Sequence, residues 1–426
     1  MVPGSPKPAQ LRGLFRLFFA IVTVLPNVSL VRVLALFLVL GALAGCGESD
    51  GPKMDPVATF LKAHWQETVP PQGQPPGHFT SLEGALSPEA CGTCHPDQFR
   101  DWQTALHSRT MGPGIYWQFE ELGQAESNRC LRCHAPLAEQ KALLAREMKW
   151  PGAPDTPPPE YVGETLHRSG LGCAACHLRK HVRYGPPAMR PPQAQLPHDG
   201  FVASEAFQDS RFCAHCHQFA DDGPRLAGKL REDTFEQWRA SSYAPDQPCQ
   251  SCHMPERRHL WRGIHDPEMV RKAIEVNLQL IRVERDQYKA EVLVRNVGAG
   301  HHFPTYLVPK VNLILRLDRN GKGGREVGRD VIGWRADVNM AGEEFDTRIP
   351  AGGSHRYVQT FEAPENAKEW QIVLSVEVDP AEHYLRMFQF SLANVKLSDA
   401  SKRQLERAMQ ASIDARFVAL TVSAKP

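Results

Sequence analysis

The chain lacks an excess of charge of either sign. Its 426 residues include 49 Lys and Arg against 48 Asp and Glu, which gives a formal net charge of +1 at pH 7. The basic residues are scattered, and they form neither a basic stripe nor a nucleic-acid reader motif. Because nucleic-acid binding depends on clustered positive charge, the sequence predicts no nucleic-acid partner.

The chain also lacks a long hydrophobic run. The apolar segment Val33–Leu43 is too short for a comfortable membrane span and is followed by small residues, as the core of a signal peptide is. The sequence Leu43-Ala44-Gly45-Cys46 resembles the end of a bacterial lipoprotein signal, in which the cysteine is lipidated. We therefore expect residues 1–46 to be a lipoprotein signal and Cys46 to carry a membrane anchor. A plain signal peptide or a short anchor with an incidental cysteine is the alternative.

Cysteine is scarce outside one repeated motif. Of the eleven cysteines, ten belong to five copies of Cys-x-x-Cys-His. Two thiols three positions apart can form thioether bonds to the two vinyl groups of one haem, and the next residue can bind the iron through its imidazole. Zinc knuckles and redox dithiols also use Cys-x-x-Cys, but neither requires a histidine directly after it. The sequence therefore predicts five covalently bound c-type haems. Their cysteines are Cys91, Cys94, Cys130, Cys133, Cys173, Cys176, Cys213, Cys216, Cys249 and Cys252, and the histidines predicted to bind iron are His95, His134, His177, His217 and His253.

The motifs recur roughly forty residues apart between residues 81 and 266. At this density the haems must lie close to one another, which predicts a continuous electron path. Pro-rich stretches between the motifs are typical of extended connectors. We therefore expect 81–266 to be a loop-rich, mostly α-helical pentahaem domain. Residues 47–80 are polar and rich in Pro and Gly, and we expect a flexible tether there with one short helix near Val57–Glu67.

The remainder of the chain changes its hydrophobic period. From Val276 onward apolar residues alternate with polar ones, which is typical of half-buried strands. Asn320–Gly324 has the composition of a hairpin turn. The pattern predicts an antiparallel β-sandwich of immunoglobulin type over residues 267–426, and the whole chain is predicted to be α+β. Expected strands begin at Val276, Ala290, Val311, Tyr357 and Gln371, and helices are expected over Met269–Ile274 and Ser398–Ala415.

The chain has eighteen histidines. After the five motif histidines are counted, enough remain to provide a second ligand for all five irons. A second histidine gives a low-spin, low-potential electron carrier, whereas an open face leaves room for a substrate. Four spare histidines are interpreted as structural because they lie in the tether or in the sandwich. His215 lies inside the fourth motif and is expected at a haem edge. The four structural residues are His64, His78, His355 and His383.

Gln98–His107 is similar to a Trp-x-x-Ser-x-His helix found after the first motif in one multihaem cytochrome c family. That family includes the tetrahaem cytochrome of nitrifiers and the haem core of hydroxylamine oxidoreductase. Ala105 stands in the serine position, and the resemblance covers roughly Ser81–Thr305. It implies that His107 is a second iron ligand. A family loop that places a histidine directly after glycine implies His301, which follows Gly300, rather than His302.

Further second ligands are expected near the motifs. The family often has a histidine a few residues after a central motif, which implies His181, although Leu178 stands where glycine is usual. His167 lies shortly before the third motif and is a further candidate. Three alternatives compete for the fifth place. Two of them lie in a segment after the fifth motif, from His259 to Lys272, that also resembles the family, and the third lies between the third and fourth motifs. These alternatives are His259, His265 and His198.

Together these patterns predict a pentahaem c-type cytochrome that carries electrons in the bacterial cell envelope through mostly bis-histidine haems. Its expected partners are redox proteins of the cell envelope, and its expected location is outside the cytoplasm, lipid-anchored on the periplasmic side or at the outer membrane. The alternative is an oxidoreductase that acts on a small nitrogen or sulfur compound at one open haem. A haem-bearing subunit of a larger assembly is a third reading. All five motifs end in His rather than in the Lys that marks some catalytic haems, which favours the carrier.

Overall fold

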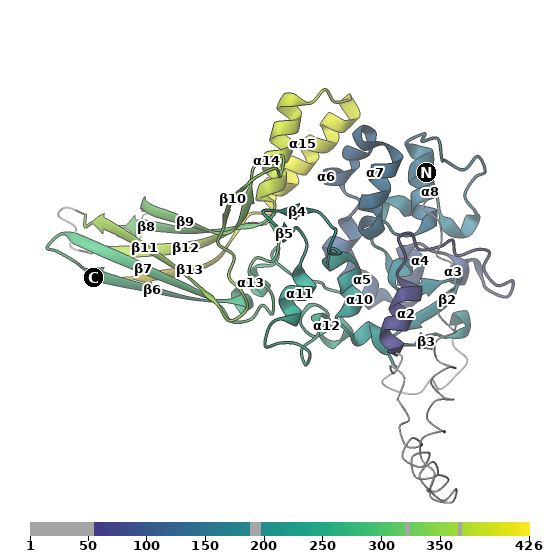
Figure 1. Ribbon diagram of the computed structural model, residues 1–426, viewed down its shortest axis with the longest axis horizontal. Helices are drawn as coiled ribbons and strands as arrows, with labels where there is room; N and C mark the ends of the chain where they lie inside the picture. Colours follow the sequence, from purple (N-terminus) through teal and green to yellow (C-terminus); the bar gives the residue numbers. More distant parts are fainter. Residues whose placement is uncertain (1–54, 188–196, 320–323, 365–368) are drawn as a thin grey trace, which may run out of the picture. The chain divides into compact units, whose positions relative to one another are not determined.

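The structure is a computed structural model that describes residues 55–187, 197–319, 324–364 and 369–426. Residues 56–426 form one compact unit in which helices precede the sheets along the chain (Figure 1). The predicted signal segment, Cys46 and most of the predicted turn over Asn320–Gly324 lie outside the described residues. Within the described ranges, no helix combines the length and apolar character that a membrane crossing requires.

The first half of the unit is built from short helices joined by irregular connectors. The two cysteines of every motif lie in a helix, with the histidine at or just after its end, and a helix places positions i, i+3 and i+4 on one face. The two thiols and the imidazole of each motif therefore project from the same side of a helix. The helices are α2 (Pro56–His64), α3 (Ser81–Gly84), α4 (Pro88–Cys94), α5 (Pro96–Thr104), α6 (Pro113–Tyr116), α7 (Gln118–His134), α8 (Ala138–Glu147), α9 (Cys173–His177), α10 (Arg211–His217), α11 (Thr234–Arg239), α12 (Cys249–His253) and α13 (Pro267–Ala273).

The segment expected to be a flexible tether is packed from Pro56 onward. Val69 is fully buried against Leu86 and Leu137 and forms a β-bridge with Leu137. The backbone N–H of Gln72 donates to Oε1 of Glu139 at 2.6 Å. Apolar and hydrogen-bonding residues within this Pro-rich stretch thus anchor it to α8. The short predicted helix is present as α2.

Two antiparallel sheets form the second half of the unit, so the predicted α+β class is confirmed. The larger sheet has the order β10-β9-β8-β12-β13, and the smaller has the order β11-β7-β6. The immunoglobulin type of the sandwich stays a prediction. The strands are β6 (Ile274–Arg282), β7 (Gln287–Asn296), β8 (Lys310–Asp318), β9 (Arg325–Ala336), β10 (Glu343–Asp346), β11 (Ser354–Glu362), β12 (Gln371–Asp379) and β13 (Phe417–Ala424).

The strands bury alternate side chains in one shared core. Val292 of β7, Leu313 of β8 and Leu374 of β12 are each fully buried in the same cluster. Fully burying such a side chain contributes about 1.5–3 kcal/mol. The period-two pattern of the sequence thus corresponds to the inward-facing positions of both sheets.

A helical hairpin interrupts the strands between β12 and β13. Its helices are α14 (Glu382–Asn394) and α15 (Asp399–Asp414), and the predicted helix over 398–415 is confirmed as α15. The hairpin lies beside α6 and α7 (Figure 1). Ser401 donates through Oγ to Oε2 of Glu120 at 2.7 Å, and Phe388 is buried with Trp117. The hairpin therefore brings residues that follow the sheets to the helix that carries the second motif.

Candidate functional site

Three motif imidazoles are oriented by the backbone. Nδ1 of His134 lies 2.8 Å from the carbonyl of Thr110, and Nδ1 of His177 lies 2.8 Å from the carbonyl of Tyr184. Nδ1 of His253 lies 2.6 Å from the carbonyl of Arg262. When Nδ1–H donates to a carbonyl, Nε2 keeps its lone pair and can bind a metal. These contacts fix both the tautomer and the direction of each ring.

Three motif histidines face a second imidazole. The ring centroids of His217 and His107 are 6.4 Å apart. Those of His177 and His259 are 6.1 Å apart. An iron bound by imidazole nitrogens at about 2 Å on both faces places the two ring centroids roughly 6 Å apart. The spacing in each pair therefore fits one iron between two rings.

The fifth motif has the most nearly parallel pair. The rings of His253 and His301 are 6.3 Å apart with an interplanar angle of 12°. Nδ1 of His301 lies 2.8 Å from the carbonyl of His302, which again leaves Nε2 available. His302 is directed elsewhere, since its backbone N–H donates to Oε1 of Gln237.

Local packing holds the loop that carries His301. The buried Asn296 donates through Nδ2 to the carbonyl of His301 at 2.8 Å. A Cβ on Gly300 would lie only 3.1 Å from Tyr243 and 3.2 Å from Trp238. Glycine at this position therefore allows the loop to approach the segment that precedes the fifth motif.

His198 is an electrostatic neighbour of His95, the histidine of the first motif. Burial lowers the pKa of His95, and the neighbouring His198 lowers it further. Nδ1 of His198 lies 2.9 Å from the carbonyl of Gly200, the same arrangement that frees Nε2 in the other rings. The sequence left His198 as one of three alternatives, and the structure brings both His198 and His259 to motif histidines.

Two predicted ligands are used differently. Nε2 of His167 lies 2.5 Å from Oε2 of Glu147, and Nε2 of His181 lies 2.8 Å from the carbonyl of Gly73. The nitrogen that binds iron in the other rings is therefore committed to a protein partner. Among the described residues, neither ring stacks on a motif histidine or interacts electrostatically with one.

An ion pair that the sequence did not reveal positions His259. Asp101 of α5 accepts from Nη2 of Arg258 at 2.6 Å and from the backbone N–H of His259 at 3.1 Å. Trp261 then contacts the rings of both His259 and His107. Asp101 and Trp261 therefore link two imidazole pairs. Asp101 lies within the Trp-x-x-Ser-x-His resemblance, but nothing in the sequence indicates its partner about 160 residues away.

Burial keeps the second-face histidines uncharged. Burial lowers the pKa of His107 to about 3, with further lowering by His217 and His253. Burial also lowers the pKa of His259 to about 4, helped by His177, and that of His301 to about 4, helped by His253. The neutral imidazole is the form that binds metal, so these environments suit iron ligands.

The motif thiols interact with one another in a defined order. The thiols of Cys91 and Cys173 are hydrogen-bond neighbours, which joins the first motif to the third. The same kind of contact joins the fourth motif to the fifth and to the second. The third motif interacts electrostatically with the fourth through Cys176. The motifs therefore connect in the order 1–3–4–5, with motif 2 attached at motif 4. The joining thiols of the fourth motif are Cys213, next to Cys249, and Cys216, next to Cys133.

No family model and no curated protein matches the chain. Among solved structures, it is similar to a crystal structure described as a penta-heme cytochrome c552 from Thermochromatium tepidum. The TM-score is 0.54 at 18% identity, and the match covers 81% of this chain and all of that one. A structural-genomics target matches 25% of this chain and 72% of its own with a TM-score of 0.16 and 9% identity. The first comparison shows a shared fold across both the helical and the β regions.

Proposed function

We propose that this chain is a pentahaem c-type cytochrome whose function is electron transfer. The observation that carries the proposal is the set of three imidazole pairs whose centroids are 6.1 to 6.4 Å apart, each containing a motif histidine. The solved relative of similar fold is described as a penta-heme cytochrome, which supports the same haem content here. The resemblance of the motif surroundings to the family of the nitrifiers' tetrahaem cytochrome supports it further.

Each motif holds one haem through its two cysteines and its histidine. His198, His107, His259 and His301 provide the second ligand at the first, fourth, third and fifth motifs. When bound, the haems supply reversible one-electron chemistry, and bis-histidine ligation favours low potentials. The protein's own contribution is to orient the imidazoles through backbone carbonyls and to keep water away from them.

The thiol contacts support a conducting role. Neighbouring thiols hold neighbouring porphyrin edges, so the order 1–3–4–5 gives electron transfer a route along the protein. Cys94 of the first motif and Cys252 of the fifth are the two exposed motif cysteines. The two ends of the route therefore reach the surface, and we expect redox partners to dock there.

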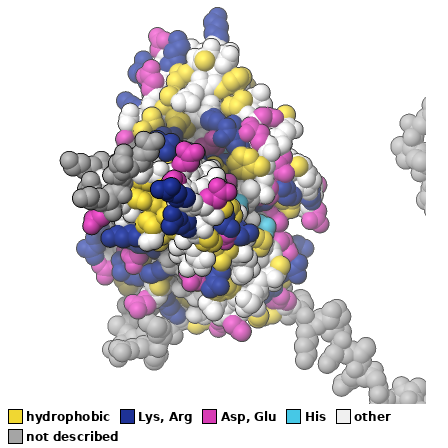
Figure 2. Space-filling view, turned by 90° about the vertical axis from the view of Figure 1, so that its left-hand side faces the viewer, with side chains coloured by type: hydrophobic (Ala, Val, Ile, Leu, Met, Phe, Trp, Pro, Cys, Tyr) yellow, Lys and Arg dark blue, Asp and Glu magenta, His cyan; other side chains and the backbone are white. Residues whose placement is uncertain are grey.

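The mixed charge of the surface suits transient docking of a partner. Lys and Arg side chains are interspersed with Asp and Glu on the face shown in Figure 2. Interspersed charge favours transient complexes over tight ones, because no single field dominates the approach of a partner. Redox proteins of the cell envelope are the partners that fit this role.

A reductive titration tests the carrier function. Mass spectrometry and a pyridine haemochrome assay should give five haems per chain, and stepwise reduction should consume five electrons per chain. A carrier should return all five electrons to an added electron acceptor. Fewer than five haems, or a haem that never exchanges electrons with the others, would contradict the proposal.

Cys46 is the proposed site of the membrane anchor. Replacing Cys46 by Ala should move the protein from the membrane fraction to the soluble fraction, because a lipidated N-terminus is then not formed. The matched control Ser49→Ala should stay in the membrane fraction. Fractionation with immunoblotting measures the distribution. Retention of the Cys46→Ala protein in membranes would show that another segment attaches it.

A further inference from the structure

A single short segment supplies hydrogen-bond acceptors to the proposed iron ligands of two haems. We name residues 254–262 the strap, and it begins directly after the fifth motif. The carbonyl of Arg257 lies 3.0 Å from Nδ1 of His259, and the carbonyl of Arg262 lies 2.6 Å from Nδ1 of His253. Donation from Nδ1 to each carbonyl fixes the direction of the ring and leaves Nε2 to bind iron. The strap therefore orients one ligand proposed at the third iron and one at the fifth.

The same strap contacts the ligand proposed at the fourth iron through an indole ring. The ring centroid of Trp261 lies 4.7 Å from that of His107 and 5.1 Å from that of His259, and both contacts are edge to face. The backbone N–H of Trp261 donates to the carbonyl of His253 at 2.9 Å, which closes the strap onto the fifth motif. Because edge-to-face packing restricts the orientation of the rings in contact, movement of the strap would affect the ligands of three irons together.

Apolar burial does not hold the strap in place. None of residues 254–262, all of which lie in the described part of the chain, is buried. Glu256, Arg257 and Trp261 have φ values of 55°, 63° and 43°, in the left-handed region that residues with a Cβ seldom adopt. A backbone in this conformation persists only where its surroundings hold it. Contacts from outside the strap must therefore maintain its shape.

Helix α5 provides such a contact through Asp101. This residue is 6% exposed, and its carboxylate accepts from Nε and Nη2 of Arg258 at 2.7 and 2.6 Å. The same carboxylate accepts from the backbone N–H of His259 at 3.1 Å. A guanidinium fork on a carboxylate fixes orientation as well as distance. One buried carboxylate thus holds the strap at the residue whose ring is a proposed iron ligand.

A second contact lies one turn further along α5. Arg262 donates through Nη1 to the carbonyl of Thr104 at 3.1 Å and through Nη2 to Oγ1 of Thr104 at 2.9 Å. Helix α5 ends at Thr104, three residues before His107. The helix that anchors the strap therefore also leads into the histidine that Trp261 contacts.

We propose that Asp101 is a positioning residue that, by holding the strap, sets the geometry of the ligands at the third, fourth and fifth irons together. Without the ion pair the strap relaxes, and the hydrogen bonds from Nδ1 to the carbonyls of Arg257 and Arg262 weaken. An imidazole that donates less strongly through Nδ1 is a less basic ligand. Ferric iron loses more stabilisation than ferrous iron, so the midpoint potentials rise. The inference rests on the proposed haems.

Removing either half of the ion pair tests the proposal in the full-length protein with its haems. Asp101→Asn and Arg258→Met should each raise the same three midpoint potentials and leave the other two unchanged. The same variants should alter the g values of the corresponding low-spin ferric signals in EPR. The double variant should change neither readout further, because the two side chains act as one unit. The Arg258 side chain is 54% exposed, so its replacement should leave the fold intact.

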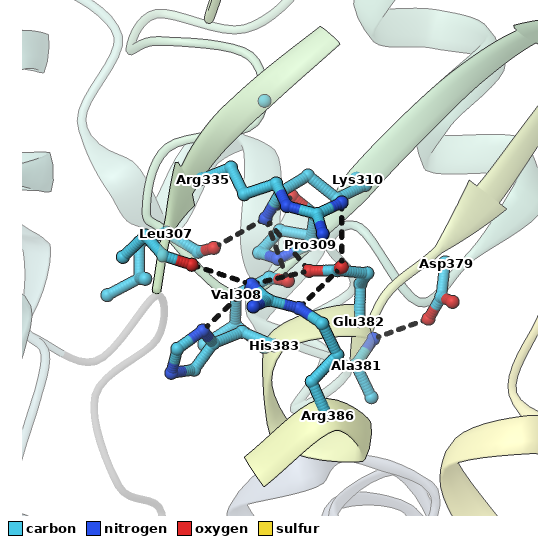
Figure 3. Close-up of polar contacts among 12 residues, drawn as sticks. Leu307, Val308, Pro309, Lys310, Arg335, Asp379, Ala381, Glu382, His383 and Arg386 are labelled. Atoms are coloured by element: carbon cyan, nitrogen blue, oxygen red, sulfur yellow. Dashed lines mark hydrogen bonds and ion pairs between the residues drawn. The ribbon is translucent and has the colours of Figure 1, made fainter. Parts of the chain in front are cut away.

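The matched control removes a buried carboxylate elsewhere in the fold. Glu382 of α14 accepts from Nε of Arg386 at 2.8 Å, and its Oε2 lies 3.4 Å from Nζ of Lys310, which is itself 2% exposed (Figure 3). Breaking a buried ion pair is destabilising, so Glu382→Gln should lower the unfolding temperature. All five potentials and the g values should remain those of the parent.

The possible results separate this inference from the proposed function. Five haems with unaltered potentials and g values in both Asp101→Asn and Arg258→Met would overturn the inference and leave the proposed function standing. A change confined to one haem would overturn the shared role of the strap. The same three shifts in Glu382→Gln would overturn the inference, because lost stability would then explain them. Fewer than five haems in the parent would overturn the proposed function, and this inference with it.

Discussion

Replacing His301 by Met raises the midpoint potential of one haem by on the order of 0.1 V and leaves the other four close to their original values. Thioether sulfur in place of imidazole nitrogen stabilises ferrous iron, and axial ligands of haem span roughly 0.8 V in potential. Potentiometric titration followed by visible spectroscopy measures the shift. The effect is large because the rings of His301 and His253 are 6.3 Å apart, which leaves one iron's width between them.

The adjacent histidine is the control. His302 follows His301 directly, but its backbone is bonded to Gln237 and its ring faces no motif histidine in the described structure. His302→Met should leave all five potentials unchanged. A shift at His302→Met with none at His301→Met would show that His302, and not His301, is the second ligand of the fifth iron.

Removing the fourth motif's thiols interrupts the route between the two ends of the protein. In the double variant Cys213→Ser/Cys216→Ser, four haems should remain, and electron transfer from the first motif to the fifth should slow by orders of magnitude. The reason is that the thiols of motif 4 are the neighbours of motifs 2 and 5 and interact electrostatically with Cys176 of motif 3. The junction position makes this the most damaging single haem to lose.

The measurement uses the His301→Met background as an electron trap. A photoreductant attached at Asp97→Cys, on exposed surface near Cys94, would inject electrons at the first motif, and absorbance would follow their arrival at the high-potential fifth haem. The variant Cys130→Ser/Cys133→Ser, which also loses one haem, is the matched control and should conduct as the parent does. Equal slowing in both variants would contradict a branched order.

The sequence predicted those parts of the site that local spacing determines. The five motifs are helical turns, so their chemistry is readable from residues three and four positions apart. His107 and His301 were also predicted, because each lies in a short segment similar to a known family. The alternation from Val276 onward predicted the strands, since burial on one face imposes a period of two.

What the sequence did not predict depends on contacts between distant segments. His198 meets the first motif because its backbone N–H bonds Oε1 of Glu83, more than one hundred residues earlier. His167 and His181 lie near a motif in sequence, yet their Nε2 atoms are committed to Glu147 and to Gly73. Proximity along the chain therefore indicates where a histidine is, but not which nitrogen is free.

Low-temperature EPR of the fully oxidised protein tests the central claim most directly. Three motif histidines face a second imidazole at 6.1 to 6.4 Å, and His198 is an electrostatic neighbour of a fourth, so the account predicts at least four low-spin ferric haems per chain. Two or more stoichiometric high-spin signals would contradict the imidazole pairs on which the proposed electron route depends.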